Sequence, residues 1–239
     1  KSKFIIVYSL EMTLENTVGM FGNRQLIESV RDVLDTPLNF FVYETKGQEY
    51  LELAKTTPTI ICFFPHTSHL DPLSIRHASP KDVRKLEVFP AAGDYWYKNK
   101  LMAVMSSLLL NTVPMERHNT ARISNSLKIA RGILDWGYSL VFSPEGTRSL
   151  VSLEERQLYR GPIDLALRGG YPIIPARLRG FENIMPKGQA PKLLNGFNRW
   201  HVSVNFGEPI PVPKLEETPK RLRESKNLVA FLKSKFLEM

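Results

Sequence analysis

The feature that most constrains the fold is a short apolar run, Ile60–Phe64, that stands between polar segments. The run offers no polar face, which is typical of a strand buried on both sides of a parallel sheet. Parallel strands need long return connections, usually helices, and segments with helical spacing of apolar residues do separate the apolar runs of this chain. We therefore expect an α/β domain in which a mostly parallel central sheet is flanked by helices on both faces.

The same alternation continues along the chain and divides it into expected strands and helices. We expect strands at residues 39–44, 59–64, 87–91, 139–142, 171–175 and 200–206, and helices at residues 24–35, 72–77, 95–110, 121–136, 162–168 and 219–236. The sequence contains no internal repeat, low-complexity tract or Gly/Ser-rich linker, which favours one domain over two. We place that domain at residues 38–239, after an N-terminal helical or membrane-contact segment at residues 1–37.

Charge and cysteine content narrow the class of partner. The 239 residues include 32 Lys and Arg against 24 Asp and Glu, a net charge of +8, which favours anionic partners. Nucleic acid is one such partner, but the basic residues are spread along the chain without an RNA-binding or helix-turn-helix signature, so we expect no nucleic acid. Cys62 is the only cysteine of the sequence, which excludes an intrachain disulfide and a multi-cysteine zinc site.

Three apolar segments are candidates for contact with a membrane. Residues 4–21 are the most apolar N-terminal stretch, but Glu11 and Glu15 interrupt them. We therefore expect this stretch to contact a membrane surface or a partner rather than to span a membrane. The second candidate is the stretch 101–110. The third is the expected C-terminal helix, whose apolar stripe we expect to pack on the core. That stripe is Leu222, Val229, Leu232 and Phe236, and it lies opposite Arg221, Arg223, Lys226 and Lys233.

The segment after the central apolar run, residues 66–71, reads His-Thr-Ser-His-Leu-Asp and lies where a strand gives way to a helix. One interpretation is structural, with Asp71 as the N-cap of a helix that begins at Pro72. A metal site of His66, His69 and Asp71 is a second, but no further ligand cluster accompanies it, so we expect no metal. The third is catalytic, with His66 as a general base whose tautomer Asp71 fixes.

The sequence offers this pair no obvious enzyme nucleophile. No serine lies in a Gly-x-Ser-x-Gly elbow, and Cys62 lies inside the expected strand. A His–Asp pair without such a nucleophile suits the activation of a hydroxyl group that a substrate supplies. Activation of water by His66 would instead give a hydrolase, and a binding domain without catalysis would not need the two residues together.

Three further blocks follow other apolar stretches. They are Val-Pro-Met-Glu-Arg at residues 113–117, Phe-Ser-Pro-Glu-Gly-Thr-Arg-Ser at residues 142–149 and Tyr-Pro-Ile-Ile-Pro at residues 171–175. Together with the block at residues 66–71, and in this order, they resemble the glycerolipid acyltransferase family. The resemblance runs from about residue 40 to residue 213 and implies the α/β fold of glycerol-3-phosphate acyltransferases.

The resemblance also implies roles for particular residues. His66 and Asp71 match the family's catalytic pair, and no cofactor is implied. The implied substrate-binding residues are Arg117, Glu145, Gly146, Thr147, Arg148 and Arg160. Arginine suits a phosphate monoester because its planar fork donates to two oxygens at once, and Gly146 allows a close backbone approach. Arg160 precedes a helix whose free N–H groups can hold a further anion.

The implied reaction moves a fatty acyl group from acyl-CoA or acyl-carrier protein to a glycerolipid hydroxyl, most closely that of 1-acylglycerol-3-phosphate, in phospholipid synthesis. The implied location is an anionic membrane surface on its cytoplasmic face. The chain departs from the family's usual residues at four positions. Pro65 replaces a common Asn, Glu116 a common Asp, Ser143 a common aromatic residue and Arg160 a common Lys. None of the four is a catalytic group, but they leave the acceptor open, so a lysophospholipid or another lipid alcohol is an alternative acceptor. An acyl-thioester hydrolase and a lipid-binding domain without catalysis are the alternative functions.

Overall fold

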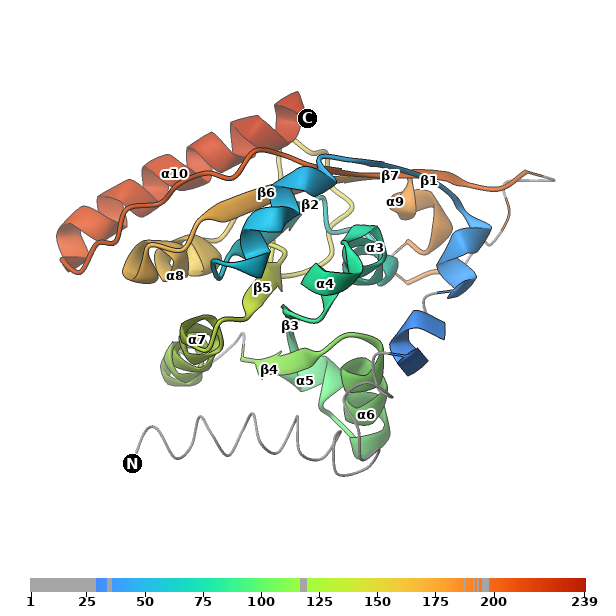
Figure 1. Cartoon of the computed structure of the whole chain (residues 1–239), viewed down its shortest axis with the longest axis horizontal. Helices are drawn as coiled ribbons and strands as arrows, with labels where there is room; N and C mark the ends of the chain where they lie inside the picture. Colours follow the sequence, from blue (N-terminus) through green and yellow to red (C-terminus); the bar gives the residue numbers. More distant parts are fainter. Residues whose placement is uncertain are drawn as a thin grey trace.

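The computed structural model describes residues 29–33, 36–116, 120–186, 188–190, 192, 194 and 198–239. Within these residues the centre is a seven-stranded sheet in the order β1–β7–β6–β2–β5–β3–β4 (Figure 1). Among these strands only the β6–β7 pair is antiparallel, so β7 and β1 run opposite to the other five. The strands are β1 (Val42–Lys46), β2 (Ile60–Phe64), β3 (Glu87–Ala92), β4 (Thr112–Met115), β5 (Ser139–Phe142), β6 (Ile173–Arg179) and β7 (His201–Phe206).

Helices cover both faces of the sheet, which confirms the expected α/β class. In Figure 1, α7, α8 and α10 lie on the left of the sheet, and α3, α4 and α9 lie on its right. The helices and 3-10 turns are η1 (Thr36–Phe40), η2 (Gln48–Lys55), α3 (Leu70–Ala78), α4 (Lys81–Arg84), α5 (Gly93–Trp96), α6 (Lys100–Leu109), α7 (Thr120–Asp135), α8 (Gly161–Gly169), α9 (Phe181–Ile184) and α10 (Thr218–Glu238).

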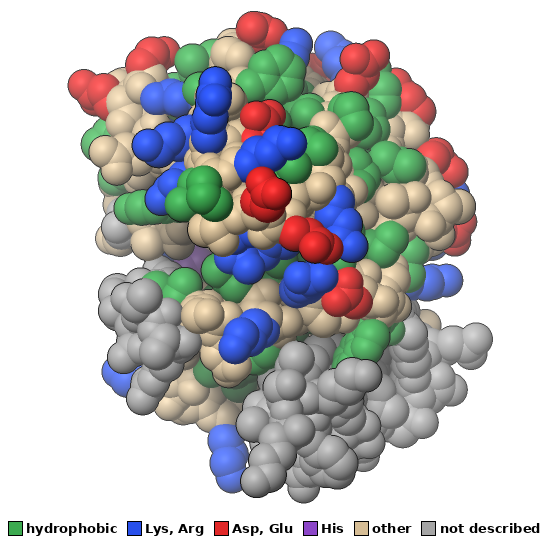
Figure 2. Space-filling model, turned by 90° about the vertical axis from the view of Figure 1, so that its left-hand side faces the viewer, with side chains coloured by type: hydrophobic (Ala, Val, Ile, Leu, Met, Phe, Trp, Pro, Cys, Tyr) green, Lys and Arg blue, Asp and Glu red, His purple; other side chains and the backbone are tan. Residues whose placement is uncertain are grey.

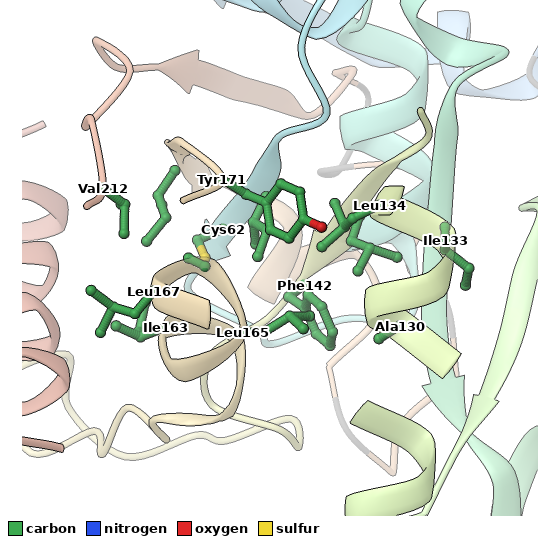
Figure 3. Packing of buried hydrophobic residues seen from close by; sticks show 14 of the residues in the cluster. Cys62, Ala130, Ile133, Leu134, Phe142, Ile163, Leu165, Leu167, Tyr171 and Val212 are labelled. Carbon is green, nitrogen blue, oxygen red and sulfur yellow. The ribbon is translucent and has the colours of Figure 1, made fainter. Parts of the chain in front are cut away.

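One core lies between the sheet and α7, α8 and α10. Cys62 of β2 belongs to it and lies between the ring of Tyr171 and the α8 residues Ile163 and Leu167 (Figure 3). Complete burial raises the pKa of the Cys62 thiol to about 12, because the thiolate would lose its hydration there. Cys62 is therefore a neutral core residue, and the site has to work without it as a nucleophile.

A second core lies on the opposite face of the sheet, against η2, α3, α4 and α9. Ile61 and Phe63 of β2 are buried there, while the alternate residues of the same strand belong to the first core. Burying each large apolar side chain stabilises the fold by about 1.5–3 kcal/mol relative to leaving it exposed. Burial on both faces explains why the central run has no polar side.

The structure differs from the expected elements at several boundaries. The expected helix at residues 95–110 is two helices, because the Asn99 side chain accepts the N–H of Met102 and caps a new start at α6. β4 was not among the expected strands; it contains Pro114, which an edge strand tolerates. β6 begins two residues later than expected and continues to Arg179.

The C-terminal helix α10 packs on the first core, as expected. Leu232 and Phe236 are fully buried, but Leu222 is 41% exposed, so the expected stripe is wrong at its N-terminal end. Arg221 was placed on the solvated basic side, whereas it is buried and its Nε lies 2.8 Å from Asp164 Oδ1. This ion pair joins α10 to the first turn of α8, a contact that helical spacing alone does not predict.

The N-terminal segment is largely outside the described residues. Residues 1–28 are not described, and of the expected helix at residues 24–35 the structure describes a helical stretch at residues 29–33. The predicted membrane-contact segment at residues 1–37 therefore stays a prediction. Within the described part of the chain, no helix combines the length and the apolar character needed to cross a membrane.

Candidate active site

The loop between β2 and α3 brings the predicted His–Asp pair together. His66 Nδ1 lies 2.9 Å from Asp71 Oδ2. The Asp71 side chain is fully buried, whereas 18% of the His66 side chain is exposed and available to a substrate. A carboxylate only accepts hydrogen bonds, so Nδ1 carries the proton and Nε2 of the neutral ring keeps a free electron pair. A general base needs this arrangement.

Asp71 is held by the backbone of its own loop. The N–H groups of Thr67 and Ser68 donate to Asp71 Oδ2 at 2.7 and 2.8 Å. The expected N-cap role differs from the structure, because the N-cap position of α3 is His69 and Asp71 lies in the first turn. The carboxylate instead folds back onto the preceding loop. These charge-assisted bonds fix the loop around His66 and the carboxylate beneath the ring.

The block at residues 142–149 begins at the last residue of β5 and forms hydrogen bonds with both the backbone N–H and the backbone carbonyl of His66. The His66 N–H donates to Glu145 Oε2 at 2.7 Å, and the Ser149 N–H donates to the His66 carbonyl at 3.0 Å. The two segments meet because β2 and β5 are parallel neighbours, so that their carboxyl ends lie at one edge of the sheet. Glu145 thus holds the backbone of His66 in place, and its implied role in binding the acceptor stays a prediction.

Arg156 completes this support, although no sequence pattern singled it out. Its Nη1 lies 3.0 Å from Glu145 Oε1, and the exposed fractions of the Arg156 and Glu145 side chains are 5% and 3%. Its Nε also donates to the Val151 carbonyl at 3.0 Å. Burial raises the pKa of Glu145, and the bonds from His66 and Arg156 oppose that rise. Nothing in spacing or composition separates Arg156 from a surface arginine.

Gly146, Thr147 and Arg148 follow Glu145, and the Gly146 N–H donates to the Ser143 carbonyl at 3.1 Å. Gly146 has a φ of 67°, in the left-handed region that favours glycine. A Cβ at this position would meet the Tyr159 ring at 3.5 Å, an ordinary contact, so backbone conformation rather than crowding explains the glycine. Gly146 and Thr147 are exposed and Arg148 is half-buried, which leaves all three accessible beside the pair.

His69, the second histidine of the loop, packs as an aromatic side chain. Its ring stacks on Tyr95 with 5.7 Å between centroids and meets Trp96 edge-on at 5.3 Å. Burial, and next the positive charge of Arg148, lower the pKa of His69 to about 4. His69 is therefore neutral at neutral pH. Within the described residues, no group of three or more His, Cys, Asp or Glu is placed to hold a metal ion.

For two predicted binding residues, Arg160 and Arg117, the structure describes no side-chain contact with His66, Asp71 or Glu145. Arg160 is exposed at the N-cap position of α8, with Pro162 in the first turn as expected. The preceding residue, Tyr159, donates its N–H to the Pro144 carbonyl at 2.7 Å, which brings this part of the chain beside the block at residues 142–149. Arg117 lies outside the described residues, so its role stays a prediction.

Known proteins resemble this chain in sequence and in fold. The Acyltransferase family model matches residues 43–179. The chloroplastic 1-acyl-sn-glycerol-3-phosphate acyltransferase BAT2 of Brassica napus is 30% identical over 129 residues, which cover 51% of this chain and 35% of that protein. The crystal structure of the 1-acyl-sn-glycerophosphate (LPA) acyltransferase PlsC from Thermotoga maritima matches with a TM-score of 0.59 and 19% identity, over 100% of this chain and 94% of that one. This last likeness shows the fold.

Proposed function

Since this chain belongs to the Acyltransferase family, we propose that it transfers a fatty acyl group from a thioester donor to a hydroxyl group of a glycerolipid. The donor is acyl-CoA or acyl-carrier protein, and the acceptor is 1-acylglycerol-3-phosphate, the substrate class in the name of the Brassica napus relative. The observation that carries the proposal is the His66–Asp71 pair, held from two sides and open to a substrate. The proposed reaction is a step of phospholipid synthesis.

The proposed mechanism uses one base and no covalent enzyme intermediate. His66 Nε2 takes the proton of the acceptor hydroxyl as its oxygen attacks the thioester carbonyl carbon. Asp71, whose Oδ2 holds Nδ1, stabilises the imidazolium that forms. The tetrahedral intermediate then collapses, its carbon–sulfur bond breaks, and the imidazolium returns the proton to the leaving thiolate. The products are the acylated glycerolipid and a free thiol.

Recognition of the acceptor phosphate is proposed for the basic residues near the pair. Arg148 lies close enough for its charge to act on His69 of the same loop as His66. Arg160 is exposed where the chain returns to the block at residues 142–149, and Thr147 is exposed on its turn. An arginine fork matches phosphate oxygens better than a lysine point charge does. Arg117 is proposed on the resemblance of its sequence block alone.

Work at a membrane surface follows from the amphiphilic acceptor, and the surface of the protein supports it. On α6, Leu101 and Met105 are 73% and 43% exposed and lie one helical turn apart. Figure 2 shows Lys and Arg side chains gathered among apolar and acidic ones across one face, beside a recess in which a histidine side chain is visible. Such a face suits an anionic lipid surface, and we place the enzyme peripherally on the cytoplasmic side of the bilayer.

The test is product identity with the purified protein. It is incubated with acyl-CoA and, separately, with 1-acylglycerol-3-phosphate, lysophosphatidylcholine, lysophosphatidylethanolamine and glycerol 3-phosphate. The proposal predicts an esterified product that is formed fastest from 1-acylglycerol-3-phosphate. Faster acylation of a neutral-headgroup lysophospholipid would overturn the proposed acceptor. Release of free fatty acid without an esterified product would make the protein a thioester hydrolase.

A further inference from the structure

Arg177 lies beside the candidate active site, and the proposed chemistry has not used it. It is on β6, directly opposite Phe64, the last residue of β2, and Phe64 is two residues before His66. Its guanidinium carbon lies 5.3 Å from the centroid of the Phe64 ring, and that of Arg156 lies 5.9 Å from the same centroid. The two arginines therefore lie against the same ring, at the end of β2 where the loop that contains His66 begins.

The two arginines differ in how their donors are used. Arg156 is paired with Glu145, as described above. Arg177 is only 7% exposed, yet among the described residues no acceptor meets its buried Nε and Nη1. Its cross-strand partner Asn205, on β7, has a buried Oδ1 that likewise lacks a described partner. Because buried polar groups in proteins are nearly always hydrogen-bonded, the two free donors of Arg177 indicate a site for a ligand that accepts hydrogen bonds.

The charges around Arg177 indicate the sign of that ligand. Arg179, Glu182, Arg156 and Glu145 are the charged groups close enough to influence it, and Glu145 is already engaged by Arg156. Counting Arg177 itself, the cluster has three arginines and two carboxylates, so it is net positive. An unbalanced buried cation is costly, and burial lowers the pKa of Arg177 accordingly. A bound anion would remove this cost.

We propose that Arg177 binds a phosphate group of a substrate, with Asn205 beside it on the same face of the sheet. The planar guanidinium donates to phosphate oxygens. Asn205 can add a donor only through its Nδ2, because its Oδ1 only accepts. This inference rests on the proposed function, because both proposed substrates contain phosphate. The acceptor contributes a phosphate monoester, and the donor contributes the phosphates of CoA or of phosphopantetheine. Arg177 thus adds a buried phosphate contact to the more accessible ones proposed for Arg148, which is half-buried, and Arg160, which is exposed.

The kinetic test compares Arg177→Met with Arg168→Met in the full chain. Both variants remove one arginine charge, but Arg168 lies on α8 outside the charge cluster around Arg177, with 46% of its side chain exposed, and serves as the control. In Arg177→Met we expect the KM for the phosphate-bearing substrate to rise about tenfold or more, with kcat nearly unchanged, because a charge-assisted bond is lost. Arg168→Met should leave both constants near those of the wild type. Unchanged KM values in Arg177→Met would overturn the proposal.

Two pairs of substrates identify the source of the phosphate. If the acceptor supplies it, Arg177→Met raises the KM for the lysophosphatidate acceptor but not the KM for monoacylglycerol, which lacks the phosphate. If the donor supplies it, the variant raises the KM for acyl-CoA but not the KM for acyl-pantetheine. An equal rise for substrates with and without phosphate would contradict a phosphate site. Arg177→Lys should restore only part of the affinity, because it keeps the charge and loses the fork.

A binding measurement keeps this inference separate from the proposed function. The melting temperature of each protein is measured with and without glycerol 3-phosphate and with and without CoA. We expect one of these probes to raise it in the wild type and in Arg168→Met, and to leave Arg177→Met unchanged. That result would support the site even if no acyl transfer were found. A large fall in the melting temperature of Arg177→Met without ligand would show a structural role and overturn the proposal.

Discussion

The N–H of His66 donates to Glu145 Oε2 at 2.7 Å, and this bond joins the two sequence blocks on which the proposed chemistry depends. Asp71 holds the imidazole ring of His66, while Glu145 holds its backbone. Glu145 is in turn paired with Arg156, so the position of the base depends on a buried ion pair that does not touch the ring.

Arg156→Met should destabilise the fold, because it leaves the Glu145 carboxylate buried without its cation. Breaking a buried pair in this way costs about 3–5 kcal/mol of the free energy of unfolding. The control is Arg168→Met, whose pair with Asp164 is 2.7 Å long but whose side chain is 46% exposed, and it should cost about 1 kcal/mol or less. Urea unfolding of both variants measures the difference. Equal losses would show that the Arg156 pair is not special.

Glu145→Gln should separate positioning of the base from binding of the acceptor. The amide oxygen can still accept the His66 N–H, but as a neutral and weaker acceptor, and Arg156 loses its carboxylate. We expect kcat to fall while the KM for the acceptor stays near its wild-type value. Steady-state kinetics with a fixed donor concentration provide the measurement. A rise in the KM for the acceptor with kcat unchanged would instead support the acceptor-binding role implied by sequence.

His69 should make the stability of the protein depend on pH. Its pKa is about 4 in the folded protein against 6.5 for an ordinary histidine, so between these values the unfolded chain binds more protons than the folded one. The free energy of unfolding therefore rises with pH through this window and falls as the pH is lowered. His69→Phe, which keeps an aromatic ring beside Tyr95, should flatten this dependence. Urea unfolding from about pH 4.5 to about pH 7 tests it, and an unchanged slope would contradict the assignment.

Arg148→Ala should raise the KM for the phosphate-bearing acceptor far more than the KM for the donor. Arg148→Lys should recover only part of the loss, since the two-pronged contact with phosphate is not restored. Arg168→Ala, which removes a charge on α8 that pairs with Asp164, serves as the control. Initial rates over a matrix of donor and acceptor concentrations give both constants. Similar effects on donor and acceptor would place Arg148 at the phosphates of CoA.

Leu101→Asn with Met105→Asn on α6 should weaken binding to vesicles that contain anionic lipid. Burying a large apolar side chain in the bilayer is worth about 1.5–3 kcal/mol, so the loss should be large for the pair. Leu222→Asn on α10, where the leucine is 41% exposed, is the matched control and should bind as the wild type does. Co-sedimentation with vesicles measures the effect. Normal binding by the α6 variant would place the contact elsewhere, such as at residues 4–21.

The central part of the fold was predictable because its signals are local. The apolar run at β2 and the strand Ser139–Phe142 were placed within one residue, since a strand buried on both faces has no polar side to blur its ends. The loop between β2 and α3 was predictable for the same reason, because His66 and Asp71 are five residues apart. The parallel sheet then follows from the helices that separate the strands.

The rest depends on contacts between distant residues, which local patterns do not contain. Helical spacing places Arg221 on the exposed face of α10, yet in the fold it forms a buried ion pair with Asp164 of α8. In the sequence, Arg156 and Arg177 cannot be told from surface arginines. In the fold, Arg177 of β6 and Arg156 of the segment between β5 and α8 both lie against the ring of Phe64. The split of the expected helix at residues 95–110 depended on one capping side chain, that of Asn99.

The most direct test of the account is the turnover rate of His66→Ala with acyl-CoA and a lysophosphatidate acceptor, compared with that of His69→Ala. General-base catalysis contributes about 10²–10⁴-fold, so His66→Ala should lose activity by that factor while its melting temperature stays near the wild-type value. His69→Ala changes the neighbouring histidine of the same loop and should keep most of the activity. Near-normal turnover by a folded His66→Ala would contradict the account.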